Sequence, residues 1–260
     1  VEKVQSDTKA RMMRLTDPYL RERMHDFADL ANRQVVFLPE HGHDQILRIG
    51  QAELVEVLMG MREPVSGRIE LEGTDISDWD VRRIREAGVG YIPEDRHRQG
   101  LLLDAPLWEN RMLGHQTQAP ASRRGILTPS DARADTERIV AEYDVRTPGI
   151  HVTVGSLSGG NQQKLIIGRE MSHAPKVLIA SHPTRGVDVG AQAAIWDLIR
   201  EARREGLAVL LISADLEELI GLSDTIKVIL RGRITGEFDP DKVTSQELGS
   251  AMTGAGKDAS

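Results

Sequence analysis

The sequence predicts an α/β fold in which helices flank a parallel β-sheet. Residues 177–180 and 207–213 are short apolar runs typical of buried strands. Residues 191–205 between them have helical periodicity and end before Gly206, a common helix stop. The inner face of that helix is expected to carry Ile195, Leu198, Ile199 and Ala202. A strand, a helix and a second strand in this order indicate parallel strands joined by a crossover.

The composition excludes several classes of protein. The 40 acidic and 33 basic residues give a formal net charge of −7, and no basic run is interleaved with aromatic residues, so we expect no nucleic-acid partner. The absence of cysteine excludes disulfides and cysteine-ligated zinc, and it favours a reducing compartment, the cytoplasm. Apolar runs such as 207–212 are far shorter than the roughly 20 residues of a membrane-spanning helix. No signal peptide is recognised, so we expect membrane contact only through a partner.

The first third of the chain is expected to contain two helices and a strand. Residues 17–31 begin with a capping Asp and a Pro at the first helical position, which predicts an amphipathic helix within an atypical segment, 1–33. Residues 34–38 are expected to form a short apolar strand. A loop rich in His and Gly then leads to a helix at 51–59, whose apolar residues have core spacing.

The middle of the chain is expected to combine a small antiparallel β portion with a helical insertion. Residues 66–77 alternate like an exposed antiparallel strand ending in a Gly-Thr-Asp turn, and residues 88–103 predict a strand that runs into a polar loop. From residue 104 to about 150 the composition is charged and typical of helices, with a break at QAPASRRG. Residues 225–238 predict a hairpin. Its turn is expected near Arg231 and Gly232.

The segment with the strongest chemical signal is residues 157–170, with the sequence LSGGNQQKLIIGRE. Ser158, Gly159 and Gly160 stand where a helix should begin, so unpaired N–H groups and the helix dipole face outward with no Cβ in the way. This arrangement suits an anion such as a phosphate group. An ordinary Ser-capped helix after a Gly-rich turn explains these residues equally well when they are taken alone.

A second motif follows, where a buried strand leads into PTRGVD and Asp188 comes two residues after Gly186. Together with LSGG, this order resembles the nucleotide-binding subunit of ATP-binding-cassette (ABC) transporters. The family's signature motif corresponds to LSGG, its Walker B strand to KVLIASHP and its D-loop to the segment containing Asp188. Its Q-loop corresponds to GVGYIPEDR, with Glu94 in the glutamine position. The sequences IPEDR, LSGGNQQK and PTRGVDVGA resemble the second of two tandem cassettes in bacterial sugar and nucleoside importers.

The resemblance covers roughly residues 50–254 and implies a P-loop NTPase-like parallel sheet with a helical subdomain. It implies a nucleotide-binding domain at 34–254, a signature subdomain at about 104–170, and a disordered tail at 255–260. Such cassettes act in pairs, on the same or on separate chains, with ATP and Mg²⁺ between them. The implied location is the cytoplasmic face of the inner membrane, bound to transmembrane permease subunits. A solute-binding protein delivers the transported solute to these subunits.

The nucleotide-gripping residues of that family are degenerate here. A phosphate loop needs glycines, a Lys for the β and γ phosphates and a hydroxyl for magnesium. Gly50 remains, but Gln51 takes the place of the Lys and Ala52 that of the hydroxyl residue. Ser181 replaces the magnesium-binding Asp of Walker B, and His182 replaces the catalytic Glu. Gln45 and Arg48 replace cradle glycines, and Ala214 the switch His.

These losses have a predicted cost in affinity. A hydrogen bond to a charged group contributes about 1.5 to 3 kcal/mol, so losing the Lys and the magnesium carboxylate together lowers nucleotide affinity roughly a hundredfold or more. His182 as a replacement base is a weaker interpretation than a structural His beside a Pro. His41, His43 and Asp44 are interpreted as solvated loop residues, and we expect no metal site on this chain.

The retained signature and the lost phosphate loop together predict a division of labour. We expect this chain to present its signature to ATP held by a partner cassette, through Ser158, Gly159, Gly160, Asn161 and Gln162. Its own site is expected to be weak or inactive, which leaves open whether it is itself an enzyme. The alternative is a non-catalytic ABC-like regulatory or protein-binding module. A third hypothesis, an active ATPase, would need Arg48 to replace the missing Lys.

Overall fold

A computed structural model describes residues 53–64, 68–230 and 233–253. The segments expected at 1–33, 34–38 and 255–260 therefore lie outside the described residues, as do the degenerate phosphate-loop residues Gly50, Gln51 and Ala52. The helix expected at 51–59 is seen as helical residues 53–58.

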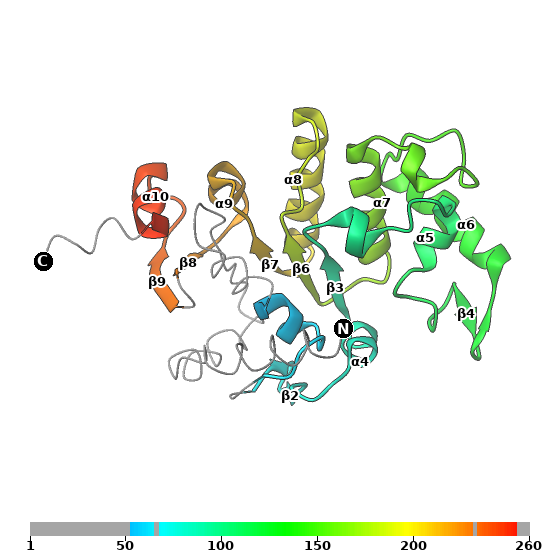
Figure 1. The fold of residues 1–260 in the computed structure, drawn as a ribbon, viewed down its shortest axis with the longest axis horizontal. Coiled ribbons are helices and arrows are strands. Elements are labelled where there is room, and N and C mark those ends of the chain that lie inside the picture. Colours follow the sequence, from blue (N-terminus) through cyan, green and yellow to red (C-terminus); the bar gives the residue numbers. More distant parts are fainter. Residues whose placement is uncertain (1–52, 65–67, 231–232, 254–260) are drawn as a thin grey trace, which may run out of the picture.

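The centre of the molecule is the predicted parallel sheet (Figure 1). Strands β3 (Val89–Ile92), β6 (Val177–Ser181) and β7 (Ala208–Ile212) lie side by side in the order β3-β6-β7. Both neighbouring pairs are parallel, and β6 and β7 are buried at every residue. Short runs without polar alternation fit this position, because a parallel sheet is covered on both faces.

The connection between β6 and β7 is helix α8 (Val189–Arg204). It begins two residues earlier than expected because Asp188 caps it, accepting a hydrogen bond from the backbone N of Ala191 at 2.9 Å. Gly206 ends the helical segment with a φ of 105°, the conformation for which glycine is the usual residue. The predicted helix and its stop are therefore confirmed.

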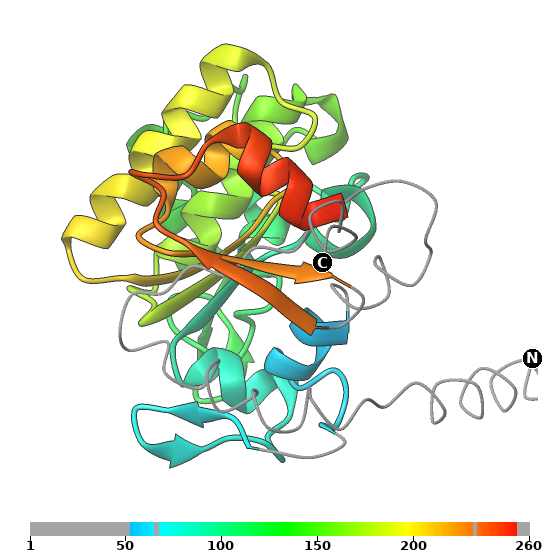
Figure 2. The ribbon, with the colours of Figure 1, turned by 90° about the vertical axis from the view of Figure 1, so that its left-hand side faces the viewer.

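Two separate apolar clusters lie on the two faces of the sheet. Figures 1 and 2 show the helices and strands that surround the sheet. Along β6, Leu178 and Ala180 point to one cluster and Ile179 to the other, as a strand's alternation requires. The first cluster lies under the helices α7 (Gly159–Met171), α8, α9 (Leu216–Leu222) and α10 (Ser245–Thr253). The second lies under residues 53–58, α4 (Val81–Glu86) and the hairpin that precedes α4.

That hairpin corrects one expectation. Of the expected strand 66–77, the described residues 68–77 do not form a single strand; they fold back as β1 (Glu70–Leu71) and β2 (Thr74–Asp75). The turn comes at Glu72 and Gly73, with φ of 51° and 77°, one residue before the expected Gly-Thr-Asp turn. Two successive left-handed residues form the tight turn whose twist suits an antiparallel pair.

The insertion between β3 and α7 contains helices α5 (Leu107–Met112) and α6 (Pro129–Glu142). The expected break at QAPASRRG is a small hairpin, β4 (Ser122–Arg123) and β5 (Ile126–Leu127). The polar loop expected after β3 is partly a π-helical turn, Arg96–Gly100, because Asp95 caps it by accepting from two backbone N–H groups. The boundaries proposed for a signature subdomain remain a prediction.

The C-terminal part contains the two strands of the predicted hairpin, whereas the turn expected near Arg231 and Gly232 lies outside the described residues. Strand β8 (Ile226–Leu230) pairs antiparallel with β9 (Arg233–Phe238), and α10 packs against β8. Across the described part of the chain, every helix is too short or too polar to span a bilayer.

Candidate functional site

The carboxyl ends of the parallel strands meet at one edge of the sheet, the usual position of ligands in such folds. Three segments leave this edge: residues 93–96 after β3, residues 182–188 after β6 and residues 213–215 after β7. The N-terminal tip of α7 lies beside the first two of these segments. The sequence motifs that are distant along the chain are thus brought together.

The tip of α7 begins at the residues where the sequence predicts the start of a helix. Ser158 is exposed and caps the helix, and its Oγ accepts from the backbone N of Asn161 at 3.5 Å and from that residue's Nδ2 at 2.9 Å. The N–H groups of Gly159 and Gly160 have no acceptor among the residues that the structure describes. Gly159 is partly exposed, whereas Gly160 is buried. The tip therefore offers free donors at a positive helix end.

The two glycines allow the tip to lie against the turn after β6. A Cβ at Gly159 would come within 2.7 Å of Arg96 Nη2 and 2.9 Å of the Gly186 carbonyl oxygen. A Cβ at Gly160 would come within 2.8 Å of Ala191 Cβ, at the start of α8. Asp188 is exposed, and its carboxylate is committed to capping α8. Ser158 and Asp188 are therefore held on adjoining parts of the surface.

Arg96 connects the segment after β3 to α7 and to the turn after β6. Its Nη1 donates to the Arg185 carbonyl oxygen at 2.7 Å, its Nη2 to the Gly186 carbonyl oxygen at 3.3 Å, and its Nε to Gln162 Oε1 at 3.2 Å. Gln162 is buried and donates in turn to the Val154 carbonyl oxygen at 3.2 Å. Sequence reasoning does not single out Arg96; its only signal is its place in IPEDR.

Glu94 and Arg185 form a second link between the same two segments. A carboxylate oxygen of Glu94 pairs with Nη1 of Arg185 across the edge of the sheet. Both side chains are exposed enough for solvent to screen the attraction. The residue in the Q-loop position is thus engaged by the chain's own turn after β6.

A comparison with known families identifies the family to which the chain belongs. A family model described as "ABC transporter" matches residues 49–185, which is more than half of the chain. The chain belongs to the ABC transporter family. Its fold is that of an ABC cassette, a P-loop NTPase fold with a parallel sheet and small antiparallel pairs.

The relatives of this ABC cassette include two named import proteins. It is 46% identical over 206 residues to the guanosine import ATP-binding protein NupO of Bacillus subtilis (strain 168), covering 79% of this chain and 40% of the relative. It is 39% identical over 209 residues to the ribose import ATP-binding protein RbsA 3 of Rhizobium etli, covering 80% of this chain and 40% of the relative. The chain thus spans about two-fifths of the length of these relatives.

A solved structure shows the same fold. The dimeric, post-hydrolysis ATP-binding cassette MJ0796 bound to ADP and Pi superposes with a TM-score of 0.65 at 17% identity. The superposition covers 81% of this chain and 86% of the other. At that identity the likeness establishes the fold alone.

The cassette's own Walker B end does not fit magnesium. Ser181 ends β6 with 6% of its surface exposed, and His182 follows with 7% exposed. His182 has a φ of 47°, and its backbone N donates to the Ile212 carbonyl oxygen at 2.7 Å, so this residue turns the chain sharply. Magnesium prefers carboxylate oxygens, and neither side chain supplies one. Within 53–64, 68–230 and 233–253, no cluster of three or more His, Asp or Glu side chains could hold a metal ion.

A buried carboxylate that sequence reasoning misses braces the same end of the sheet. Glu218 of α9 is 1% exposed and accepts from Ser213 Oγ at 2.5 Å, Thr184 Oγ1 at 2.7 Å and Trp196 Nε1 at 3.1 Å. It therefore joins the turn after β6, the end of β7 and helix α8. Its three donors satisfy it, which indicates a structural role.

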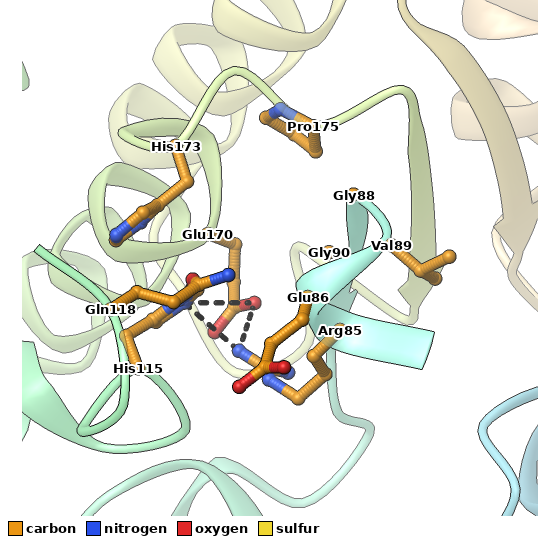
Figure 3. Close-up of a pocket in the computed structure, with 10 residues that line it drawn as sticks. All are labelled: Arg85, Glu86, Gly88, Val89, Gly90, His115, Gln118, Glu170, His173 and Pro175. Carbon is orange, nitrogen blue, oxygen red and sulfur yellow. Dashed lines mark hydrogen bonds and ion pairs between the residues drawn. The ribbon is translucent and has the colours of Figure 1, made fainter. Parts of the chain in front are cut away.

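A second polar cluster lies near the opposite ends of the strands, in a cavity of about 100 Å³ (Figure 3). Arg85 Nη2 donates to Glu170 Oε2 at 2.8 Å and lies 3.0 Å from His115 Nε2. Arg169 Nε donates to the other oxygen of Glu170 at 2.9 Å. Burial opposes ionisation of Glu170, but the two arginines outweigh it and lower its pKa to about 2. His115 stacks on His173 with ring centroids 4.1 Å apart.

Proposed function

We propose that this chain is one cassette of an importer for nucleosides or sugars, and that it presents its signature to ATP held by a partner cassette. The observation that carries the proposal is the tip of α7. Ser158 is exposed there, and the amides of Gly159 and Gly160 have no acceptor among the described residues. Two relatives are named for guanosine import and for ribose import, which supports a nucleoside or a sugar as the transported substrate.

The chemistry assigned to this chain is electrostatic. The amides and the Ser158 hydroxyl would meet the γ-phosphate of the partner's ATP and stabilise the charge that develops as it is transferred. Asn161, which donates to Ser158 Oγ, and the buried Gln162 hold the cap and the first turn in place. The partner's Lys, magnesium and catalytic carboxylate would supply the rest of the reaction.

The chain's own nucleotide site is proposed to be weak or inactive. Ser181 and His182 provide no metal-binding carboxylate at the end of β6. The sequence places Gln51 where the phosphate-binding Lys belongs. ATP binding and any turnover would therefore depend on the second cassette.

The remaining partners follow from the importer proposal. Transmembrane permease subunits would receive the movement of the paired cassettes, through the region around Glu94 and the helical insertion. A solute-binding protein would act only indirectly, on the other side of the membrane. The cassette would then reside at the cytoplasmic face of the inner membrane as a peripheral subunit.

The test replaces Ser158 by a bulky residue. In a complex reconstituted with a competent cassette, we expect Ser158→Trp to lower ATP turnover about tenfold or more, because it displaces the helix tip from the phosphate. Ser245→Trp is the matched control, since Ser245 is also exposed in the first turn of a helix, α10, which packs against β8 and lies outside the helical insertion.

Unchanged turnover with Ser158→Trp would overturn this function. The cassette would then be the non-catalytic regulatory or protein-binding module that the sequence leaves as the alternative. That module predicts no nucleotide dependence at the tip of α7.

A further inference from the structure

Arg96 makes contacts that the proposed chemistry does not itself require. One guanidinium reaches acceptors 66, 89 and 90 residues further along the chain, on α7 and on the turn after β6. Two of these acceptors are backbone carbonyl oxygens, so the contacts depend on where the main chain lies. No other described side chain links these three segments in one fork of hydrogen bonds.

These contacts depend on the planar, forked shape of the Arg96 guanidinium as well as on its positive charge. Each guanidinium nitrogen serves a different acceptor, an arrangement that the planar group allows and a Lys ammonium does not. His97 Nε2 lies 2.9 Å from the same Gln162 oxygen, which fixes that amide from a second side. Burial lowers the pKa of Arg96, although a guanidinium remains charged in proteins.

The fork also fills the space that Gly159 leaves open. A side chain at Gly159 would begin only 2.7 Å from Arg96 Nη2 and 2.9 Å from the Gly186 carbonyl oxygen. The tip of α7, the guanidinium and the turn after β6 are therefore in direct contact. A shift of any one of them displaces the other two.

We propose that Arg96 is a positioning residue that locks the tip of α7 to the turn after β6, so that Ser158 and Asp188 face the partner cassette as one unit. The consequence for ATP turnover rests on the proposed function, whereas the lock itself does not. Because Arg96 belongs to the segment after β3, movement of that segment passes directly to the signature tip. The Glu94 and Arg185 pair reinforces this link at the surface.

The first experiment measures the lock in the isolated chain. Amide hydrogen exchange is compared for Arg96→Met and for Arg98→Met, an exposed arginine two residues away whose side chain bonds to no other described residue. We expect Arg96→Met to speed exchange around residues 158–164 and 185–191 by about tenfold, because charge-assisted hydrogen bonds are lost. Arg98→Met should leave both segments unchanged. Equal exchange in the two variants would overturn the lock.

The second experiment measures turnover in the reconstituted pair. Arg96→Met should lower kcat by about tenfold to a hundredfold, since small misplacements of a catalytic group have effects of this size. The KM for ATP should change little, because the partner cassette holds the nucleotide. Arg96→Lys, which keeps the charge and loses the fork, should recover only a minor part of kcat. Full recovery with Lys would mean that charge suffices and would overturn positioning.

The two proposals can fail separately. If Ser158→Trp leaves turnover unchanged while Arg96→Met speeds exchange, the proposed function fails and the lock stands as a structural feature. If Ser158→Trp lowers turnover and Arg96→Met does not change kcat, the positioning role fails. Thermal melting of each variant, with Arg96→Lys as the milder change, separates these results from loss of folding.

Discussion

The buried side chain of His115 is expected to make the stability of this cassette depend on pH. Burial is the main cause that lowers its pKa to about 3, and Arg85 and His173 lower it further while Glu170 opposes them. Arg85 Nη2 can only donate, so the facing Nε2 of His115 must accept, which requires the neutral ring. The 3.9 Å approach of His115 to Glu170 is therefore a contact of a neutral imidazole, without ion pairing.

The predicted effect is a loss of stability in mild acid. The unfolded chain protonates His115 near its ordinary pKa of 6.5 while the folded chain does not, so the contribution is complete above pH 6.5 and is lost as pH falls toward 3. Between pH 7 and 5 this amounts to about 2 kcal/mol in the free energy of unfolding. Urea denaturation at both pH values measures it.

The matched variant for this measurement is His115→Gln. It should flatten the dependence on pH between 7 and 5 without abolishing it, because the pKa of His173 is lowered by burial as well. Glu170 does not interfere, since its contribution is lost only below its ordinary pKa of 4.5. An identical dependence in wild type and variant would contradict the assignment.

Whether a site residue could be predicted depends on how far along the chain its interaction partners lie. The cap Ser158 follows from the sequence because it bonds to an amide only three residues away along the chain. The sequence places Asp188 in the D-loop position but does not predict that it caps α8. Arg96 and Glu218 do not follow from the sequence, because their partners come from segments far along the chain that the fold alone brings together. The sequence also contains no sign that Glu94 pairs with the turn after β6.

Among the helices, α6 and α7 pack so closely that one glycine sets their separation. A Cβ at Gly168 of α7 would lie 2.6 Å from Ile139 Cγ2 and 2.9 Å from Tyr143 Cδ2. Gly168→Ala should therefore lower the free energy of unfolding by about 1 to 3 kcal/mol, because overcrowding outweighs the better helix propensity of Ala. Chemical denaturation measures the change.

A Gly→Ala substitution in α10 should change the free energy of unfolding in the opposite direction. Gly249 lies within α10, and a Cβ there would have no neighbour within 4 Å. Gly249→Ala should raise the free energy of unfolding by about 0.5 to 1 kcal/mol through the smaller loss of backbone entropy. Equal effects at Gly168 and Gly249 would show that propensity, and not the α6 contact, decides both.

The elements with a strong local pattern are the ones that sequence reasoning recovers. Apolar strands and the period of α8 lead directly to the parallel sheet, and Gly206 marks the end of that helix. The hairpin at Glu72 and Gly73 is missed because a non-glycine residue there takes a left-handed conformation. The hairpin within the insertion turns in the same way, at Arg124 and Gly125.

Across the whole described fold, the exposed Ser158 at the tip of α7 is combined with Ser181 and His182 at the end of β6, which supply no carboxylate. The proposed function therefore predicts asymmetric pairing. Two copies of this chain would bring two signature tips to two sites where Gln51 replaces the Lys. Neither site would grip the triphosphate, and the signature would have nothing to bind. We therefore expect the chain alone to remain monomeric in ATP and Mg²⁺.

Pairing should appear when a competent cassette is added. With a partner whose catalytic carboxylate is replaced by Gln, so that ATP persists, sedimentation velocity should show a heterodimer in ATP and Mg²⁺ and separate chains in ADP. Ser158→Trp should abolish the heterodimer, and Ser245→Trp should preserve it. Dimerisation of this chain alone in ATP would contradict the asymmetry, because it would require a functional phosphate site on the chain itself. Association to the same extent with and without nucleotide would instead indicate a surface used only for protein contact.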